Sequence, residues 1–304
     1  RPIVGVTGSN GKSTVVAILA KICAEAGLDY AVGGNLDGEQ FKPALDLLIE
    51  PRRDFYILEL SSFQLETTRN LNAHAVTLLN LSEDHMDRYD SFDAYWHAKQ
   101  RIFKGCKNVV VNKDDIKSRP IVSEEIAVIE FGLGEPESNS LGILLENGLE
   151  NLTYGEQPIV SVNELKIVGP HNVANVLAAA GLALTLGINI PEIRKAVTEF
   201  SGLPHRCQWV ADKQGISFYN DSKGTNVGAT VAAIEGLAKK ISGRIVLIAG
   251  GVGKGADFKP MSSAVKNCVK TVILIGEDAK LIAACLNSES DIRFASSLQE
   301  AVSC

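Results

Sequence analysis

Short apolar runs alternate with longer segments of helical periodicity along the first part of the chain. Runs of this length are typical of buried strands, and apolar residues spaced three and four apart are typical of helices that pack on one face. Strands that alternate with helices favour a parallel sheet. We therefore predict an α/β fold, with early strands at residues 3–6, 55–60, 75–79 and 108–111 and helices at residues 12–26 and 92–103.

The pattern changes near residue 140 and again after residue 200. Between residues 140 and 168, short apolar segments are separated by Asn-Gly and Gly-Glu turns, which predicts a small antiparallel addition. Two helices are predicted at 172–186 and 191–200. The segment 201–206 contains Gly and Pro and is the best candidate for a linker. The alternation then restarts, with helices at 226–240 and 297–303 and strands at 244–249 and 271–275.

These elements predict two domains. Residues 1–202 are expected to form a parallel-sheet domain, and residues 203–304 a second, Rossmann-like α/β domain that is incomplete. A chain of 304 residues is long enough for both. The chain begins with Arg1 and enters an apolar strand at once, so we expect it to be a piece of a longer protein.

Composition narrows the class of protein. A hydrophobic content of 45% with 22% charged residues is typical of a soluble globular protein. The net charge of −6 argues against nucleic acid as the main partner. No apolar run reaches the roughly 18 residues that a membrane span needs. The six cysteines form no CxxC pair, so we expect idle thiols in a reducing cytoplasm rather than a metal or redox site.

The stretch VGVTGSNGKSTVVA at residues 4–17 predicts a phosphate-binding loop. A glycine-rich turn between a strand and a helix exposes backbone N–H groups to an anion, and the helix dipole adds positive charge. Lys12 can reach the β- and γ-phosphates, and the hydroxyl of Ser13 or Thr14 can bind Mg²⁺. The usual pattern has glycine where Val6 stands. The predicted loop consists of Gly8, Ser9, Asn10, Gly11, Lys12, Ser13 and Thr14.

A second stretch, NKDD at residues 112–115, leaves the identity of the nucleotide open. Asn112, Lys113 and Asp115 fit the NKxD pattern by which GTPases read guanine. Such GTPases also carry DxxG between the phosphate loop and NKxD, and the matches here, DKQG and DSKG, lie downstream at residues 212 and 221. A polar turn is therefore the better interpretation. A GTPase-like switch stays as the alternative from another class.

Eight stretches occur in order along nearly the whole chain. They are TGSNGKST (7–14), LELSSFQLE (58–66), EDHMDRY (83–89), HAKQRIF (97–103), GPHNVAN (169–175), GLPHR (202–206), NDSKGTN (220–226) and GGVGKGADF (250–258). Together they resemble the Mur ligases of peptidoglycan synthesis. Two of them, LELSSFQLE and NDSKGTN, look like the D-glutamate-adding branch rather than another Mur-type ligase or a folylpolyglutamate synthase.

The resemblance implies an ATP-dependent ligase with Mg²⁺. The carboxylate of UDP-N-acetylmuramoyl-L-alanine would take the γ-phosphoryl group of ATP, and the amine of D-glutamate would attack the resulting acyl phosphate. The family also begins with a domain that binds uridine diphosphate and has a longer C-terminal domain. We therefore expect this chain to hold the ATPase domain and most of the next one.

The resemblance also assigns metal ligands. Ser13, Glu59 and His85 would bind Mg²⁺, and Lys99 would join them as a carbamate, because the matching lysine of the family is carbamylated. Glu59 also ends an apolar strand, where ligands of α/β sheets bind, and an exposed strand-end residue is its lesser alternative. Without the resemblance, Lys99 is a solvated helix residue. Together with Lys12, the residues Glu59, His85 and Lys99 are the predicted catalytic set.

The remaining assignments concern the nucleotide and the two substrates. The resemblance gives Asn172 a hydrogen bond to adenine, although it also suits a helix N-cap. Arg206 would contact the γ-phosphate and Asp221 the ribose. D-glutamate would be held by Lys223, Thr225 and Lys254, and the muramoyl substrate would lie near Asn35. The family usually reads GNIG where this chain has NLDG, and Val252 stands where Asp is expected.

Overall fold

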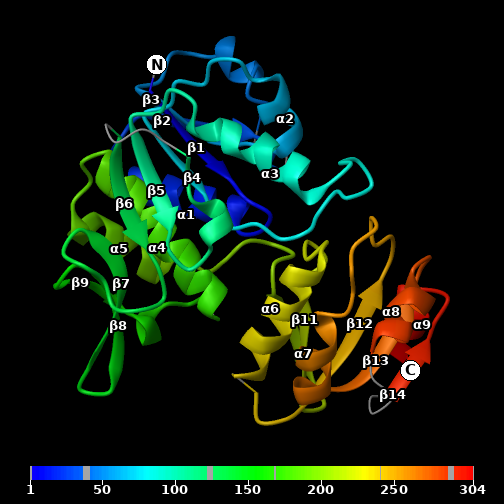
Figure 1. Cartoon of the computed structure of the whole chain (residues 1–304). Helices are drawn as coiled ribbons and strands as arrows, with labels where there is room; N and C mark the ends of the chain where they lie inside the picture. Colours follow the sequence, from blue (N-terminus) through cyan, green and yellow to red (C-terminus); the bar gives the residue numbers. More distant parts are fainter. Residues whose placement is uncertain are drawn as a thin grey trace. The chain divides into compact units, whose positions relative to one another are not determined.

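The computed structural model describes residues 2–36, 42–121, 126–167, 169–239, 241–286 and 291–303. The chain forms two compact units, each described by itself (Figure 1). Unit 1 contains Arg1–Leu81 and Asp93–Leu203, and unit 2 contains Ser82–Phe92 and Pro204–Cys304. The short segment 82–92 therefore belongs with the second unit although unit 1 surrounds it in sequence. The division into domains after residue 202 stays a proposal.

Unit 1 is built on one sheet, and its nine described strands follow the order β2-β3-β1-β4-β5-β6-β7-β8-β9. Neighbouring strands are parallel from β2 to β7, and the last two pairings are antiparallel. This confirms the parallel sheet and the antiparallel addition. The strands are β1 (Ile3–Thr7), β2 (Tyr30–Gly34), β3 (Phe55–Glu59), β4 (Ala75–Leu78), β5 (Asn108–Asn112), β6 (Ala127–Phe131), β7 (Ser140–Glu146), β8 (Leu149–Tyr154) and β9 (Gln157–Ser161).

The strand order reverses at β1. The chain leaves β1 for the edge strand β2, returns to β3 beside β1, and then crosses to β4 on the other side of β1. In open α/β sheets, ligands bind outside the carboxyl ends of the strands at such a reversal. The loop after β1 therefore lies between the ends of β3 and β4.

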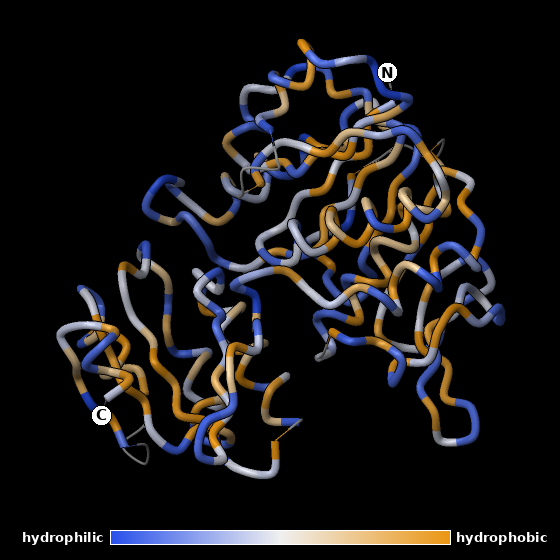
Figure 2. The backbone as a smooth tube through the Cα atoms, turned by 180° about the vertical axis from the view of Figure 1, so that it is seen from behind, coloured by the Kyte–Doolittle hydropathy of each residue, from blue (hydrophilic) through white to orange (hydrophobic). Residues whose placement is uncertain are grey.

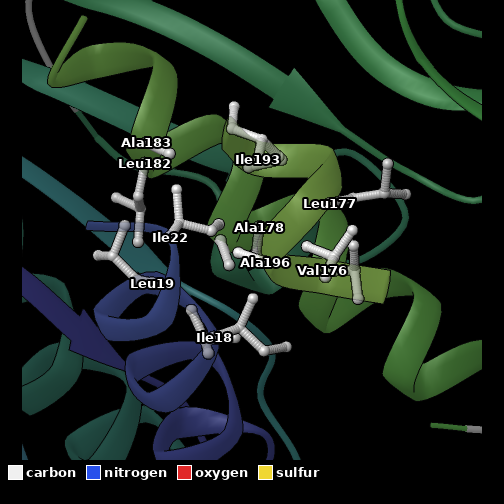
Figure 3. Close-up of a cluster of buried hydrophobic side chains, with 14 of the residues drawn as sticks. Ile18, Leu19, Ile22, Val176, Leu177, Ala178, Leu182, Ala183, Ile193 and Ala196 are labelled. Atoms are coloured by element: carbon white, nitrogen blue, oxygen red, sulfur yellow. The ribbon is translucent and has the colours of Figure 1, made fainter. Parts of the chain in front are cut away.

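Three helices cover one face of this sheet: α1 (Lys12–Glu25), α4 (Pro170–Thr185) and α5 (Ile190–Glu199). The centre of their contact is apolar, with Ile18, Leu19, Ile22 and Leu182 fully buried (Figure 3). Val4 and Val6 of β1 belong to the same core. Burying each such side chain contributes about 1.5–3 kcal/mol, so α1 is held firmly at the point where the loop enters it.

The other face carries α2 (Ser62–Thr67), α3 (Phe92–Gln100) and the 3₁₀ turn η2 (Arg101–Phe103). Side chains alternate between the two faces along a strand. Gly5 of β1 points to this second face, where a Cβ would lie 3.4 Å from Ile102 of η2 and from Val76 of β4. The close approach brings α3 and its lysine toward the end of β1.

Unit 2 combines an antiparallel hairpin with a parallel sheet of three described strands, β12-β13-β14. Its core includes Ile234, Val265, Val272, Leu274 and Ile282. The parallel sheet with intervening helices agrees with the Rossmann-like expectation. The elements are β10 (Gln208–Lys213), β11 (Ile216–Asn220), α6 (Val227–Ala238), β12 (Ile245–Gly250), α7 (Met261–Cys268), β13 (Val269–Ile275), α8 (Ala279–Cys285), β14 (Asp291–Phe294) and α9 (Leu298–Ser303).

Apolar character follows the strands and the packed helices, and hydrophilic segments are concentrated in the connections (Figure 2). No helix within the described ranges is both long and apolar enough to cross a membrane. Three short 3₁₀ turns complete unit 1: η1 (Asp46–Leu48), η3 (Ile116–Ser118) and η4 (Val162–Glu164).

Candidate active site

The glycine-rich loop after β1 has the shape that its sequence predicts. Gly8 and Gly11 have φ values of 153° and 85°, and α1 begins directly after Gly11. A Cβ on Gly11 would lie 2.3 Å from Oδ1 of Asn175, whose side chain is buried in α4. Residue 11 must therefore be glycine for two reasons, its left-handed backbone and the amide packed against it.

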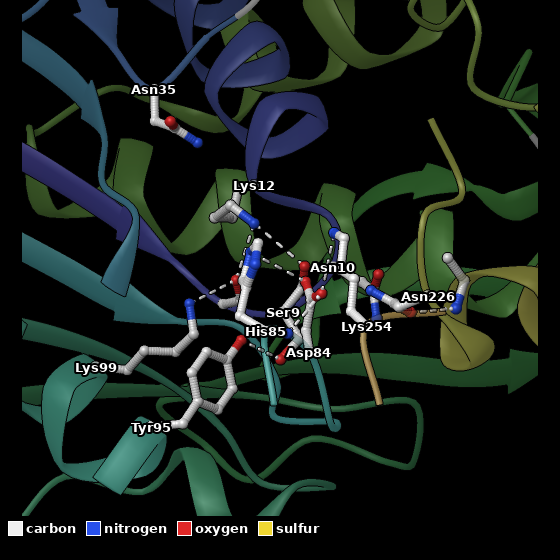
Figure 4. A network of polar contacts seen from close by, with 12 residues as sticks. Ser9, Asn10, Lys12, Asn35, Asp84, His85, Tyr95, Lys99, Asn226 and Lys254 are labelled. Carbon is white, nitrogen blue, oxygen red and sulfur yellow. Dashed lines mark hydrogen bonds and ion pairs between the residues drawn. The ribbon is translucent and has the colours of Figure 1, made fainter. Parts of the chain in front are cut away.

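Lys12 folds back over this loop. Its Nζ donates hydrogen bonds to the backbone oxygens of Gly8 at 2.9 Å and Ser9 at 3.1 Å (Figure 4). The ammonium thus lies at the concave side of the loop, held by two neutral acceptors. An anionic oxygen in the loop would be a stronger acceptor than a neutral carbonyl, because Coulomb attraction to the ammonium adds to the hydrogen bond.

A second lysine reaches the loop from α3. Lys99 is 2% exposed, and its Nζ donates to the Gly8 carbonyl oxygen at 3.0 Å and contacts the Thr7 hydroxyl at 3.4 Å. Its ammonium also lies 4.9 Å from the centre of the Tyr95 ring, and the Tyr95 hydroxyl hydrogen-bonds that of Ser9 at 2.9 Å (Figure 4). The interpretation of Lys99 as a solvated helix residue is therefore wrong.

Glu59 lies at the carboxyl end of β3, beside β1, and is 2% exposed. The alternative of an exposed strand-end residue is wrong, because the end of β2 covers it. The Asn35 backbone N–H donates to the Glu59 carbonyl at 2.9 Å, and the Asn35 side chain contacts Oε1 at 3.4 Å. A Cβ on Gly34 would lie 2.1 Å from the same carbonyl, so only glycine permits this approach.

Two asparagines that hold the loop were missed from the sequence. Asn80, just after β4, hydrogen-bonds both the N–H and the C=O of Asn10. Asn175 packs on Gly11 and donates to Oδ1 of Asn172 at 3.3 Å. The available signals were a lone polar residue after a buried strand and the second asparagine of GPHNVAN. The N-cap of α4 is Gly169, so the suggestion that Asn172 caps this helix is wrong.

Residues of the stretches LELSSFQLE and HAKQRIF hold α2 against the segment after α3. Ser61 and Gln64 form a capping box at the start of α2. Arg101 donates to the carbonyl oxygens of Leu65 at 2.7 Å and Thr68 at 3.0 Å, at the other end of the helix. Side chains thus hydrogen-bond the backbone groups at both ends of this short helix. These bonds fix α2, which follows Glu59, against the segment that follows Lys99.

The NKDD stretch forms a polar turn, as the better of the two interpretations predicts. Asn112 donates to the Leu79 carbonyl at 2.8 Å, and Asp115 accepts from the N–H groups of Leu81 and Lys117. Lys113 donates to the Glu135 carbonyl. The side chains of Asn112, Lys113 and Asp115 thus hydrogen-bond backbone groups, and this structural role accounts for all three residues.

Unit 2 brings together two groups of predicted residues. In the first, Asp84 accepts the His85 backbone N–H at 3.0 Å, and its carboxylate lies 3.5 Å from Nζ of Lys254. Lys254 has a φ of 53° in the loop after β12, where Gly253 N–H donates to Asp278 at 2.6 Å. The loop GGVGKG is thus braced from the adjacent strand end and presents Lys254 beside an acidic partner.

The second group joins GLPHR to NDSKGTN. Asp221 accepts from the Cys207 N–H at 2.8 Å, and the Lys223 N–H donates to the His205 carbonyl at 3.1 Å. Burial raises the pKa of the Asp221 carboxyl, while the Cys207 hydrogen bond and the charge of Arg206 act in the opposite direction. The two loops therefore place Arg206, Asp221, Lys223 and Thr225 in one stretch of unit 2.

Comparison with known proteins decides the family. The model of the Mur ligase middle domain matches residues 6–183, and that of the Mur ligase glutamate ligase domain matches residues 205–304. The chain belongs to the Mur ligase family.

Curated relatives of this Mur ligase include two proteins named UDP-N-acetylmuramoylalanine–D-glutamate ligase. The one from Pseudomonas syringae pv. tomato is 48% identical over 94% of this chain and 62% of its own length. The one from Pseudomonas aeruginosa is 47% identical over 99% of this chain and 66% of its own length. The chain therefore spans less than two thirds of these relatives.

Solved structures show the same fold at low identity. A crystal structure of MurF from Acinetobacter baumannii has a TM-score of 0.78 at 20% identity and covers 99% of this chain and 69% of its own. The folylpolyglutamate synthase of Mycobacterium tuberculosis has a TM-score of 0.74 at 14% identity and covers 99% of this chain and 83% of its own. Mur ligase architecture thus extends over both units.

Within this Mur ligase, the predicted residues fall into separate sets. Unit 1 gathers the phosphate loop, Glu59, Lys99 and Asn35 at the carboxyl ends of β1, β2 and β3, with Asn172 reaching the loop through Asn175. Unit 2 carries His85 with Lys254, and Arg206 with Asp221, Lys223 and Thr225. Each set is preformed by contacts inside its own unit.

Proposed function

We propose that the chain carries the ATP-handling and amino-acid-binding parts of a ligase that joins D-glutamate to UDP-N-acetylmuramoyl-L-alanine. The observation that carries this proposal is the phosphate loop of unit 1, with Lys12, Lys99 and Glu59 gathered around it at the point of strand reversal. The names of the relatives support the choice of substrates.

The loop residues fit ATP. Gly8 and Gly11 allow the positive φ of the loop and its close packing against Leu79 and Asn175, and α1 begins directly after Gly11. Lys12 already lies over the loop and can exchange two carbonyl acceptors for β- and γ-phosphate oxygens. Asn172, Arg206 and Asp221 are proposed to hold the adenine, the γ-phosphate and the ribose.

Ser13, Glu59 and His85 are proposed to bind Mg²⁺ together with the nucleotide. No cluster of three or more His, Cys, Asp or Glu side chains suited to a metal occurs among the described residues. Mg²⁺ usually takes one or two carboxylates plus substrate phosphates rather than an all-protein cage, so the nucleotide would supply part of its ligand set. When bound, the ion neutralises charge on the transferring phosphoryl group.

The remaining residues position the reactants. Lys223, Thr225 and Lys254 are proposed to hold D-glutamate, and Asn35 to lie near the muramoyl substrate. Lys254 now faces the carboxylate of Asp84 at 3.5 Å. A dicarboxylate amino acid offers the same kind of partner. Since phosphoryl transfer depends mainly on positioning and charge neutralisation, this chain needs cations at defined places more than reactive side chains.

Lys99 is proposed to carry a carbamate in the active enzyme and to bind Mg²⁺ through it. An unmodified ammonium this close to the loop would repel the metal. We expect Lys99→Ala to lower D-glutamate-dependent phosphate release at least about tenfold and to abolish its stimulation by bicarbonate. Lys104→Ala, a change in the same segment away from the loop, is the control. Full activity of Lys99→Ala would contradict the assignment.

Amide-product analysis tests the proposed activity. The full-length protein is incubated with MgATP, UDP-N-acetylmuramoyl-L-alanine and an equimolar mixture of amino acids. Mass spectrometry then identifies the products. We expect the D-glutamate adduct to dominate. Preference for another amino acid would assign a different Mur-type ligase, and glutamate addition to a folate would assign a folylpolyglutamate synthase. Support of the reaction by GTP as well as by ATP would contradict the proposed nucleotide.

A further inference from the structure

The phosphate loop is held by Asn80, which lies just after the neighbouring strand β4. The amide of Asn80 accepts the Asn10 N–H through Oδ1 at 2.8 Å and donates from Nδ2 to the Asn10 carbonyl at 3.0 Å. The Asn80 backbone carbonyl also accepts the N–H of Ser9 at 3.0 Å. A single residue therefore makes three hydrogen bonds to two consecutive residues of the loop.

The loop also packs against this strand end. A Cβ on Gly8 would lie 3.1 Å from Cβ of Leu79 and 3.4 Å from the Asn80 nitrogen. The strand end is fixed from its other side, because Asn112 of β5 donates to the Leu79 carbonyl at 2.8 Å. The contacts form a chain from β5 through the end of β4 to the loop.

These contacts engage two backbone N–H groups of the loop. The N–H groups of Ser9 and Asn10 point to Asn80 and are already hydrogen-bonded there. The N–H groups that follow, from Gly11 into the first turn of α1, carry the positive end of the helix dipole. The anion-binding part of the loop is thereby shifted toward the helix.

We propose that Asn80 is a positioning residue of the nucleotide site, which holds the loop in its phosphate-receiving shape and withdraws the Ser9 and Asn10 N–H groups from phosphate binding. The proposal rests on the proposed function, since it takes the loop's ligand to be a nucleotide. Preorganisation of this kind raises affinity by removing the ordering that a free loop would have to undergo on binding.

Asn80→Ala tests the proposal, with Asn108→Ala as the matched control. Asn108 stands at the amino end of β5, and its Nδ2 donates to the His74 carbonyl at 2.7 Å, at the opposite end of the same strands. Both changes remove an asparagine side-chain amide that hydrogen-bonds backbone groups, Asn80 beyond the carboxyl end of β4 and Asn108 at the amino end of β5. We expect Asn80→Ala to weaken MgATP binding about tenfold by calorimetry, since two hydrogen bonds are lost, and Asn108→Ala to leave the affinity unchanged.

Hydrogen exchange of the Asn10 amide gives a readout that needs no nucleotide. We expect this amide to be protected in the parent and in Asn108→Ala, and to exchange at least tenfold faster in Asn80→Ala. Equal MgATP affinities for Asn80→Ala and parent, or equal loss in both variants, would overturn the proposal. If the parent binds no MgATP, the proposed function fails. Faster exchange of the Asn10 amide in Asn80→Ala alone would still support the role of Asn80 in holding the loop. Unchanged exchange of this amide in Asn80→Ala would overturn that role.

Discussion

Replacing Lys12 with alanine is expected to weaken MgATP binding by about ten- to a hundredfold. In the structure its ammonium lies over the loop and donates to the carbonyls of Gly8 and Ser9. Transfer of these hydrogen bonds to phosphate oxygens adds a charge-assisted contact worth roughly 1.5–3 kcal/mol, and each 1.4 kcal/mol is about tenfold in affinity. Isothermal titration calorimetry with the parent and the variant measures the difference.

Lys21→Ala is the control for this change. Lys21 lies on the same helix but pairs with Glu199 of α5 at 3.0 Å, away from the loop. It is an exposed ion pair, so its loss should cost little stability and leave the affinity for MgATP unchanged. Equal affinities for Lys12→Ala and parent would show that Lys12 does not bind the phosphates.

Gly34→Ala is expected to lower the free energy of unfolding of unit 1 by about 3 kcal/mol. A non-glycine residue at the φ of 105° is strained, which typically costs about 1–3 kcal/mol. The added Cβ would also lie 2.1 Å from the Glu59 carbonyl oxygen. Relief of that overlap requires a backbone shift, for which overpacking costs of about 1–3 kcal/mol are usual. Urea denaturation measures the loss.

Gly27→Ala separates the two causes. Gly27 has a φ of 67°, and a Cβ there meets nothing within 4 Å, so only the backbone strain of about 1 kcal/mol applies. If Gly34→Ala is no less stable than Gly27→Ala, the end of β2 does not pack closely against the Glu59 carbonyl. Because the shift displaces Glu59, MgATP binding should also weaken in Gly34→Ala and not in Gly27→Ala.

The strongly patterned elements of unit 1 follow from the sequence, and its weakly patterned elements do not. The helix expected at residues 12–26 is α1, and the strand expected at 55–60 is β3. The strand β2 was missed because YAVGG ends in two glycines, which leaves an apolar run of only three residues, YAV. The six-residue helix α2 was missed because its local pattern is brief and its ends are satisfied by Ser61, Gln64 and Arg101.

The site residues likewise divide into those that local sequence defines and those that depend on tertiary packing. Lys12 and its loop are visible in the sequence because local turn chemistry defines them. The burial of Lys99 depends on how α3 packs on β1, and the reach of Asn80 depends on which strand lies beside the loop. Neither fact is local. The membership of segment 82–92 in unit 2 is equally hidden, since EDHMDRY carries no linker signal.

The most direct test of the account is a measurement of phosphate release against the supply of the two substrates. The full-length protein is given MgATP with UDP-N-acetylmuramoyl-L-alanine, with D-glutamate, or with both, and phosphate and amide product are counted in the same sample. We expect release only when both substrates are present, with one phosphate for each amide formed. Sustained release without D-glutamate, or amide formation without ATP consumption, would contradict the proposed ligase.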